Sequence, residues 1–299
     1  MTFRSLLFVP GDRPERFDKA AASGADALIL DLEDSVTAEN KGRARDAIAA
    51  RLSGDRTGPA LFVRVNPADG ADHAADLAAI GAHRPDGIVL PKAEHADDVS
   101  RLAARLTGVP ILPIATETPR AIFGLGSYAT VARHLAGLTW GAEDLPAAIG
   151  ATAARLPDGG YTAPIELARS LMLFGAHAAG VPAIETIYPA FNDLDGLATY
   201  AARGRRDGFS GMMAIHPKQI AVINAAFTPD AAERAWALRI VAAFEAAPGV
   251  GALQLDGKMI DAPHLKQARA VISRGHGGDV DVTSDHRAMV PTVTASATR

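Results

Sequence analysis

Eight short apolar runs recur along the chain, and each is followed by a segment whose apolar residues have helical spacing. The runs cover Ser5–Gly11, Ala27–Asp34, Ala60–Asn66, Gly87–Lys92, Pro110–Glu117, Leu138–Asp144, Pro182–Pro189 and Gly211–Pro217. Runs that are apolar almost throughout are typical of parallel strands covered by helices. Eight strand–helix units is the number that closes a TIM barrel. The sequence therefore predicts an α/β fold, a TIM (β/α)8 barrel, with an open doubly wound sheet as the alternative.

The chain continues well beyond the eighth run, so the barrel does not account for all of it. We assign residues 1–228 to the barrel and residues 229–274 to a C-terminal helical extension made of a helix, a hairpin-like turn and a second helix. Residues 275–299 have little apolar content and are expected to form a flexible tail. Within the barrel, residues 150–179 exceed what one crossover needs, which predicts an inserted loop and an additional helix.

Composition excludes several classes of function for the 299-residue chain. A net charge of −4 and a pI near 6.1 give no electrostatic footprint for nucleic acid or for an anionic membrane. The longest apolar runs are too short to span a bilayer or to act as a signal peptide, so we expect a cytoplasmic protein. Because cysteine is absent, any metal site must use oxygen or imidazole ligands.

Charged residues follow several of the apolar runs, where the active site of a TIM barrel lies. Glu117 and Asp144 close the neighbouring fifth and sixth runs, so their carboxylates can converge on one point. Two carboxylates with water and substrate oxygens is the usual way in which proteins hold Mg²⁺. Arg64 closes the third run and could pair there with a substrate carboxylate or a developing enolate.

Each of these residues also has an ordinary structural interpretation. Glu117 could be a first-turn helix acid, and Asp144 could be a helix N-cap. Arg64 could form a structural ion pair with the acids of the second run. His216 is better explained as a packed or helix-capping residue than as a metal ligand, because no second histidine lies at ligand spacing. Their shared position at one barrel rim is therefore the stronger argument for a functional site.

Seven motifs together resemble the citrate lyase β-subunit family, part of the HpcH/HpaI aldolase/citrate lyase superfamily that also contains malyl-CoA, β-methylmalyl-CoA and citramalyl-CoA lyases. The resemblance runs in order from about Phe3 to about Ala270. It implies a TIM barrel that depends on Mg²⁺, or on Mn²⁺, and is a homotrimer or a dimer of trimers. The motifs are "FVPGDRPERFDKAAASGADALILDLEDSV", "VRVNP", "GIVLPK", "ETPRAI", "WGAEDL", "GMMAIHPKQI" and "DGKMIDAPHLKQA".

The same resemblance implies a role for individual residues at the rim. Glu117 and Asp144 would be the protein ligands of the metal, and Glu117 would also contact the substrate. Arg64 would be the catalytic, substrate-binding arginine that stabilises the enolate. Glu33 and Asp34 would lie behind the metal and hold its waters, and Asp31 would belong to the same layer of acids.

Two further assignments rest on the resemblance. Asp261 in "GKMIDAP" would be the catalytic acid/base that reaches a neighbouring subunit's site, whereas taken alone it is a helix N-cap ahead of Pro263. Phe8, Arg13 and Lys19 would bind the adenosine diphosphate part of CoA, although a surface charge run of this kind is usually only solvated.

The implied activity is cleavage or formation of a 3-hydroxy-3-carboxyl acyl-CoA, such as malyl-CoA or citramalyl-CoA. The products of cleavage would be an acyl-CoA and a small 2-oxo acid. Two enzymatic alternatives stay open, a malyl-CoA thioesterase and a lyase β subunit that acts on a citryl thioester of an acyl carrier protein. A non-catalytic binding or regulatory barrel is the alternative from another class.

Overall fold

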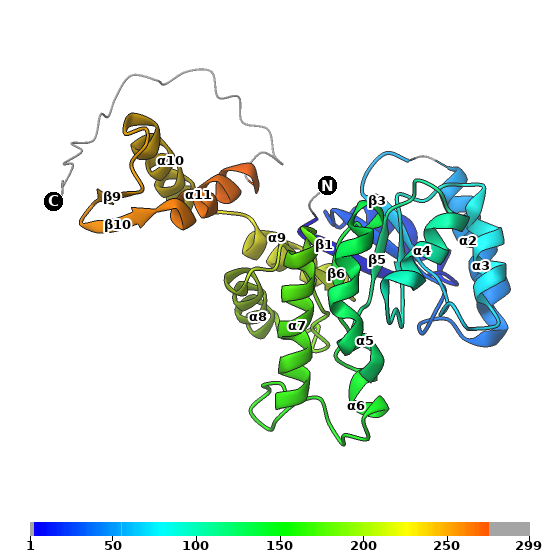
Figure 1. The fold of residues 1–299 in the computed structure, drawn as a ribbon. Coiled ribbons are helices and arrows are strands. Elements are labelled where there is room, and N and C mark those ends of the chain that lie inside the picture. Colours follow the sequence, from blue (N-terminus) through cyan, green and yellow to red (C-terminus); the bar gives the residue numbers. More distant parts are fainter. Residues whose placement is uncertain (1–2, 55, 275–299) are drawn as a thin grey trace. The chain divides into compact units, whose positions relative to one another are not determined.

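The computed structural model describes residues 3–54 and 56–274 and divides the chain into two compact units (Figure 1). The first unit ends at Phe227 and the second begins at Thr228. The expected flexible tail, residues 275–299, lies outside the described residues. In the part of the chain that is described, no helix is long and apolar enough to cross a membrane.

The first unit contains eight parallel strands in the order β5-β4-β3-β2-β1-β8-β7-β6. The two strands at the ends of this order are joined by parallel bridges from Ile111 to Leu135 and from Ile114 to Thr139. The sheet therefore closes on itself, which confirms the TIM barrel and rules out the open doubly wound sheet. The strands are β1 Ser5–Pro10, β2 Ala27–Asp31, β3 Ala60–Arg64, β4 Gly87–Leu90, β5 Ile111–Pro113, β6 Leu138–Thr139, β7 Ala183–Glu185 and β8 Gly211–Ala214.

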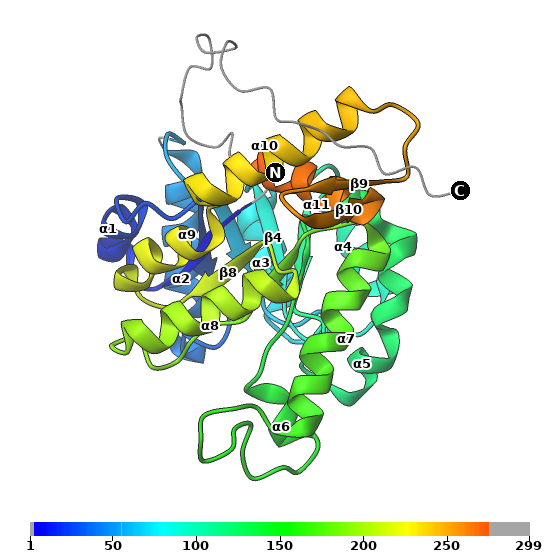
Figure 2. The same ribbon diagram turned by 90° about the vertical axis from the view of Figure 1, so that its left-hand side faces the viewer.

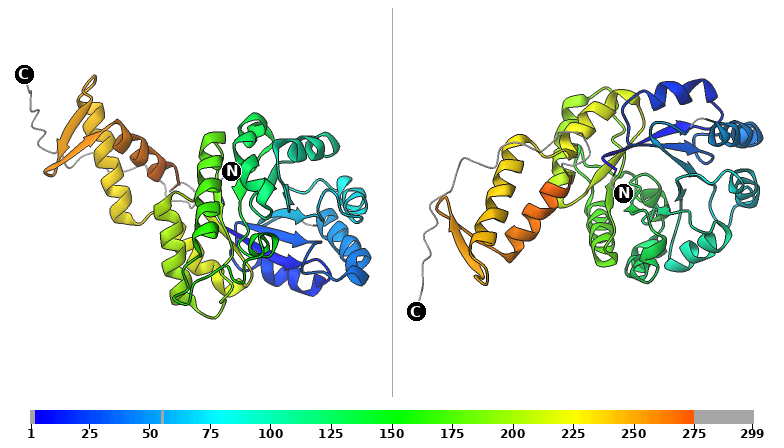
Figure 3. Two further views of the ribbon diagram at one scale, coloured as in Figure 1. Left: turned by 60° about the horizontal axis from the view of Figure 1, so that its bottom comes forward. Right: turned by 90° about the horizontal axis from the view of Figure 1, so that it is seen from above.

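Helices cover the outer face of these strands (Figures 2 and 3). The main ones are α1 Phe17–Ala21, α2 Lys41–Ser53, α3 His73–Gly81, α4 Ala96–Arg105, α5 Pro119–Gly124, α6 Asp144–Ala148, α7 Ala163–Ala179, α8 Leu194–Asp207 and α9 Ile220–Phe227. Short 3₁₀ segments are η1 Pro14–Arg16, η2 Ala38–Asn40, η3 Leu125–His134 and η4 Pro217–Gln219. Alternate residues of β2 pack outward against the helices, such as Leu28, or into the barrel, such as Ile29. This burial on both faces is why the strands are apolar throughout.

The long crossover between β6 and β7 has the predicted composition. The short helix α6 is followed by an exposed loop and then by the 17-residue α7. An isolated antiparallel bridge from Arg155 to Tyr161 closes the loop. The extra chain is therefore placed directly after the strand whose end carries Asp144.

The second unit is built from a helix, a hairpin and a helix, as expected for the C-terminal extension. These are α10 Ala231–Ala246, the antiparallel strands β9 Ala252–Leu255 and β10 Lys258–Asp261, and α11 Ala262–Arg274. Its small apolar core includes Ile240 and Ile260. The hairpin turn has positive φ at Asp256 and Gly257, the conformation that a two-residue hairpin favours.

Candidate metal and substrate site

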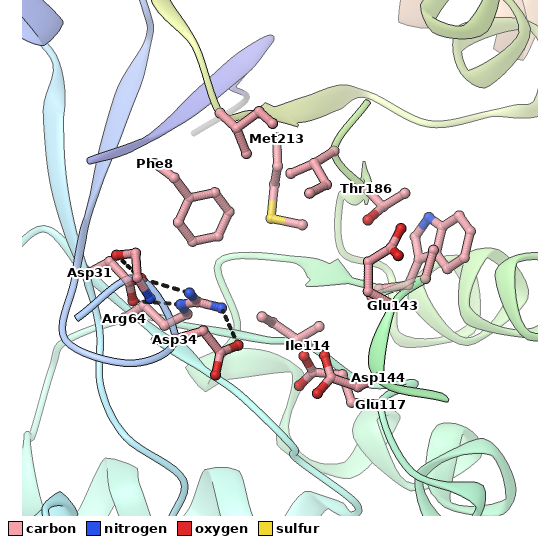
Figure 4. A pocket seen from close by; sticks show the side chains of 16 residues that line it. Phe8, Asp31, Asp34, Arg64, Ile114, Glu117, Glu143, Asp144, Thr186 and Met213 are labelled. Atoms are coloured by element: carbon pink, nitrogen blue, oxygen red, sulfur yellow. Dashed lines mark hydrogen bonds and ion pairs between the residues drawn. The ribbon is translucent and has the colours of Figure 1, made fainter. Parts of the chain in front are cut away.

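A cavity of about 360 Å³ lies where the carboxyl ends of the barrel strands meet (Figure 4). One part of its wall is apolar, with Phe8, Ile114 and Met213 among the lining side chains. Another part is strongly acidic. Its charged side chains are Asp31, Asp34, Arg64, Glu117, Glu143 and Asp144. The cavity therefore combines apolar surface with a concentration of carboxylates that needs positive charge.

Glu117 and Asp144 follow the neighbouring strands β5 and β6 and both line this cavity, where the charge of Asp144 acts on Glu117 (Figure 4). Glu117 is 4% exposed. Burial, with the nearby charges of Asp144 and Glu33, raises the pKa of Glu117 to about 8, although a hydrogen bond from the Lys92 backbone opposes this. A buried carboxyl group with a raised pKa beside a second carboxylate is stabilised in its charged form by a cation.

The ordinary structural interpretations do not account for this pair. Helix α5 begins at Pro119, and its N-cap is Thr118, whose hydroxyl accepts a hydrogen bond from the backbone N–H of Ala121 at 3.1 Å. Glu117 therefore precedes the helix altogether. In α6 the N-cap position belongs to Glu143, and Asp144 is the first helical residue. Both ligand candidates are left available to the cavity.

The donor set of this pair fits a hard divalent cation. Both side chains offer carboxylate oxygens, the ligands that Mg²⁺ prefers. No group of three or more potential metal ligands exists among the residues that the structure describes. A cation held by Glu117 and Asp144 would therefore take its remaining ligands from water and substrate, which is the usual pattern for Mg²⁺.

Arg64 lies opposite this pair in a cluster of acids. Its Nε and Nη2 donate to the two carboxylate oxygens of Asp31 at 2.6 and 2.7 Å. Its Nη1 lies 2.8 Å from Glu33 Oε2 and 3.6 Å from Asp34 Oδ2. Its guanidinium lies 4.8 Å from the centroid of the Phe8 ring. The structural ion pair considered from the sequence is thus present, and it fixes the orientation of Arg64 at the cavity wall.

Lys92, which follows β4, was not among the predicted site residues. Its Nζ donates to Glu33 Oε1 at 2.7 Å and lies 3.6 Å from Asp144 Oδ1. Its backbone N–H donates to Glu117 Oε2 at 2.5 Å. Burial tends to lower the pKa of Lys92, but Glu33, Glu117 and Asp144 outweigh it and raise that pKa. The signal in the sequence was its position at the end of the fourth apolar run.

The three residues expected to bind CoA lie in two different environments. Phe8 lines the cavity beside Arg64. Arg13 and Lys19 are exposed on the connection that follows β1, and neither lines the cavity. Arg13 Nε is 3.9 Å from Asp12 Oδ1. Two of the three therefore face solvent, where phosphate groups could reach them.

Asp261 and His216 each lie directly before a helical segment. Asp261 ends β10 in the second unit, directly before α11, and its Oδ1 is 2.5 Å from Nδ1 of His264. The hydrogen bond with His264 lowers the pKa of Asp261. His216 is the N-cap of η4 and accepts from the backbone N–H of Lys218. The capping interpretation of His216 is confirmed.

Residues 4–217 match the family model described as HpcH/HpaI aldolase/citrate lyase. The chain belongs to this family. Residues 176–277 also match a model described as a C–C bond lyase of the TIM-barrel fold. The second match includes the hairpin that carries Asp261, so the family likeness extends into the second unit.

Two relatives and one solved structure illustrate this relationship. A citrate lyase subunit beta-like protein from Mycobacterium tuberculosis is 38% identical over 269 residues, covering 90% of this chain and 94% of that protein. A (3S)-malyl-CoA thioesterase from Cereibacter sphaeroides is 34% identical over 277 residues, covering 91% of this chain and 94% of that protein. Among solved structures, this chain matches CitE from Mycobacterium tuberculosis, crystallised in complex with magnesium, acetoacetate and coenzyme A. The TM-score is 0.80 at 35% sequence identity, and the match covers 92% of this chain and 98% of CitE.

A buried network fixes the strand end that carries Asp144 in this family member. Glu185 of β7 is fully buried and accepts hydrogen bonds from Trp140 Nε1 at 2.6 Å and Tyr200 OH at 3.0 Å. Arg169 Nη2 donates to its other oxygen at 2.6 Å. Since Trp140 directly precedes the Gly141–Asp144 segment, these bonds restrain the loop that presents Asp144 to the cavity.

Proposed function

We propose that this family member is a Mg²⁺-dependent carbon–carbon lyase that acts on CoA thioesters. Its substrate would be a 3-hydroxy-3-carboxyl acyl-CoA such as malyl-CoA or citramalyl-CoA, and cleavage would give an acyl-CoA and a 2-oxo acid. The observation that carries the proposal is the pair Glu117 and Asp144 beside Arg64 at one cavity. The magnesium and coenzyme A in the related CitE structure support it.

Glu117 and Asp144 would hold Mg²⁺, with Mn²⁺ as a substitute, and Glu117 would also contact the substrate. When bound, the cation supplies Lewis-acid polarisation of the carbonyl group that forms on the 2-oxo acid. Glu33 and Asp34 would orient the water molecules around the cation, and Asp31 would hold Arg64. This division of roles follows the contacts of each acid, since Asp31 makes two bonds to Arg64.

Arg64 would stabilise the thioester enolate. In cleavage the hydroxyl group gives up its proton to solvent and becomes the carbonyl of the 2-oxo acid. The bond between the carbon α to the thioester and the hydroxyl-bearing carbon breaks, and its electron pair passes to the thioester side. The negative charge develops on the thioester oxygen, so a fixed guanidinium at the cavity wall lowers the barrier. The bidentate bond to Asp31 means that Arg64 needs no reorientation when this charge appears.

Asp261 would protonate the enolate carbon in cleavage and remove the same proton in condensation. We propose that the extension, residues 229–274, brings Asp261 to the active site of a neighbouring subunit in a homotrimer or a dimer of trimers. Phe8, Arg13 and Lys19 would bind CoA, the two basic side chains by contact with its phosphates. Their exposure on the barrel surface is compatible with a large solvated ligand.

Two other functions use the same cavity. The likeness to a (3S)-malyl-CoA thioesterase favours hydrolysis of the thioester as the second candidate. A citryl thioester on an acyl carrier protein is the third. A non-catalytic barrel is disfavoured, because a protein without chemistry has no need of a buried, incompletely compensated carboxyl group such as Glu117 at an open cavity.

The deciding experiment incubates purified protein and Mg²⁺ with a panel of CoA thioesters and identifies products by mass spectrometry. A lyase releases glyoxylate or pyruvate together with an acyl-CoA. A thioesterase releases the intact hydroxy acid and free CoA. Turnover of a citryl acyl carrier protein alone would assign the third function. The Glu117→Ala variant is the matched control, and product formation that survives in it would contradict catalysis at this site.

A further inference from the structure

Lys92 has a backbone conformation that is unusual for its residue type. Its φ is +51°, in the left-handed region, and only two other non-glycine residues of the described chain share a positive φ. A side chain with a Cβ is disfavoured there, so such a residue persists only where its surroundings hold it. In this conformation the backbone N–H of Lys92 is directed to the buried Oε2 of Glu117 at 2.5 Å.

The side chain of Lys92 extends the same connection to two further acids. Its ammonium donates to Glu33 Oε1 at 2.7 Å and lies 3.6 Å from Asp144 Oδ1. These acids follow different strands, β2 and β6, and Glu117 follows a third. Lys92 is therefore the residue at which both proposed metal ligands and the Arg64 cluster come together.

The cations of the site, Arg64 and Lys92, pair with different sets of acids. Arg64 is within ion-pair distance of Asp31, Glu33 and Asp34. Within the described part of the chain, the ion pair that Asp144 forms is the one with Lys92. A divalent cation at Glu117 and Asp144 would come close to this ammonium and be repelled by it. Lys92 and the cation therefore compete for the same negative charge.

We propose that Lys92 is the internal counter-cation of the metal site and sets its affinity for Mg²⁺. This inference rests on the proposed function, because it takes Glu117 and Asp144 as the ligands. Lys92 acts as a positioning residue through its backbone, which occupies Oε2 of Glu117 and leaves Oε1 for the cation. Its ammonium compensates Asp144 before the metal binds and must yield part of that ion pair when the metal arrives.

A merely structural ion pair predicts the opposite effect on metal binding. If Lys92 only held the acids in place, its removal would loosen the ligands and weaken Mg²⁺ binding. If it competes with the cation, its removal strengthens Mg²⁺ binding, because one positive charge no longer repels the ion. The sign of the change in affinity therefore separates the two roles without any measurement of turnover.

The test is calorimetric titration of Mg²⁺ into the full-length Lys92→Met variant. Methionine retains the backbone N–H and removes the charge, so we expect affinity about tenfold higher than in the wild type. Lys92→Arg should restore wild-type affinity. Lys218→Met, which removes an exposed lysine from η4, controls for net charge and should not change affinity. Without metal, Lys92→Met should melt at a lower temperature than the wild type, and saturating Mg²⁺ should narrow that difference.

Unchanged or weaker Mg²⁺ binding in folded Lys92→Met, with binding intact in the wild type and lost in Glu117→Ala, would overturn the role of Lys92 alone. A wild-type protein that binds no Mg²⁺ would overturn the proposed metal site and this inference with it. If Lys92→Met does not fold, Lys92→Gly replaces it, since glycine adopts the positive φ without strain and keeps the N–H. Lys92→Gly should show the same gain in Mg²⁺ affinity. If it does not, the proposed role of Lys92 is wrong.

Discussion

Two buried carboxylates at the same barrel rim, Asp31 and Glu117, have opposite electrostatic fates. They are 1% and 4% exposed. Burial alone would raise the pKa of Asp31, but two hydrogen bonds from Arg64 outweigh it and lower that pKa. Glu117 accepts one backbone N–H from Lys92 and lies beside Asp144, and its pKa rises to about 8. One acid is compensated within the protein and the other is not.

The difference separates the rim into a supporting part and a reactive part. Near β2 and β3, Arg64 compensates Asp31 through two hydrogen bonds, whereas Glu33 Oε2 accepts no hydrogen bond among the described residues. Near β5 and β6, Lys92 at 3.6 Å from Asp144 compensates the pair only in part. An incompletely compensated pair is what a cation-binding site requires, because a fully satisfied one gains little from the ion.

The largest expected effect comes from removal of either acid of the reactive part. Glu117→Ala or Asp144→Ala should abolish Mg²⁺ binding and turnover while the barrel stays folded, since both side chains line the cavity and neither belongs to the apolar core. Calorimetric Mg²⁺ titration and circular dichroism measure the two outcomes. The control is Glu143→Ala, which should keep Mg²⁺ binding, because Glu143 lies beside Thr186 and is not a proposed ligand (Figure 4). Wild-type Mg²⁺ affinity in either ligand variant would remove the distinction between the two parts.

The sequence predicted this arrangement unevenly. The eight strands were recognisable because a barrel strand is buried on both faces and is apolar throughout. The strand ends were placed too late: the run Leu138–Asp144 contains only the two strand residues Leu138–Thr139. The chain leaves the sheet early there to form the Gly141–Asp144 loop that lines the cavity.

The contacts inside the site were harder to predict than its position. The bond from Arg64 to Asp31 was one of several pairings that the sequence allowed, because strand register and rotamer decide among neighbouring acids. Lys92 was missed as a site residue because its role depends on a positive φ and a backbone N–H. Residue type specifies neither the positive φ nor the direction of the N–H, so the spacing of residues in the sequence does not predict this role.

A third carboxylate, Asp261, extends the comparison to the second unit. Its pKa is lowered by the hydrogen bond with His264, which favours the ionised form that would remove the proton in condensation. Asp261→Ala should lower kcat by about 10²–10⁴-fold and leave Mg²⁺ binding intact. Kinetics and titration of the same preparation separate this outcome from a loss of metal.

Mixing inactive Asp261→Ala with inactive Glu117→Ala protein tests whether the site is shared. Some mixed sites would receive one intact residue from each chain, so partial activity should return. If labelled subunits demonstrably exchange and activity stays absent, Asp261 acts within its own chain or serves only as a cap before α11.

Removal of Arg64 should break the supporting part rather than the metal site. Arg64→Met leaves the buried Asp31 without its ion-pair partner and leaves Glu33 with Lys92 alone, and losing one member of a buried ion pair costs about 3–5 kcal/mol of unfolding free energy. Urea unfolding measures it. Arg13→Met, at an exposed arginine, should change the unfolding free energy by only about 0.5 kcal/mol. If Arg64→Met were as stable as Glu117→Ala, the two clusters would not differ in the way inferred here.

The smallest expected effect is on the pH dependence of Mg²⁺ affinity. Glu117, with its pKa of about 8 in the metal-free protein, must lose its proton before it can bind a cation. Apparent affinity should therefore rise by about tenfold per pH unit between pH 6 and 8 and then level off. Titrations at pH 7 in buffers of different ionisation enthalpy should show nearly one proton released per Mg²⁺. A flat affinity profile over this range would mean that Glu117 is already ionised without metal.

Glu117 and Asp31 should make the stability of the metal-free protein depend on pH with opposite signs. The pKa of Glu117 lies above its ordinary 4.5, so the folded state binds more protons than the unfolded state and loses stability as the pH rises from about 5 to 8. The pKa of Asp31 lies below its ordinary 3.8, so its contribution is present above that value and is lost as the pH falls below it. Glu117→Gln should remove the loss at neutral pH and leave the acid limb unchanged. If Glu117→Gln loses unfolding free energy from pH 5 to 8 as the wild type does, the group that titrates in this range is not Glu117.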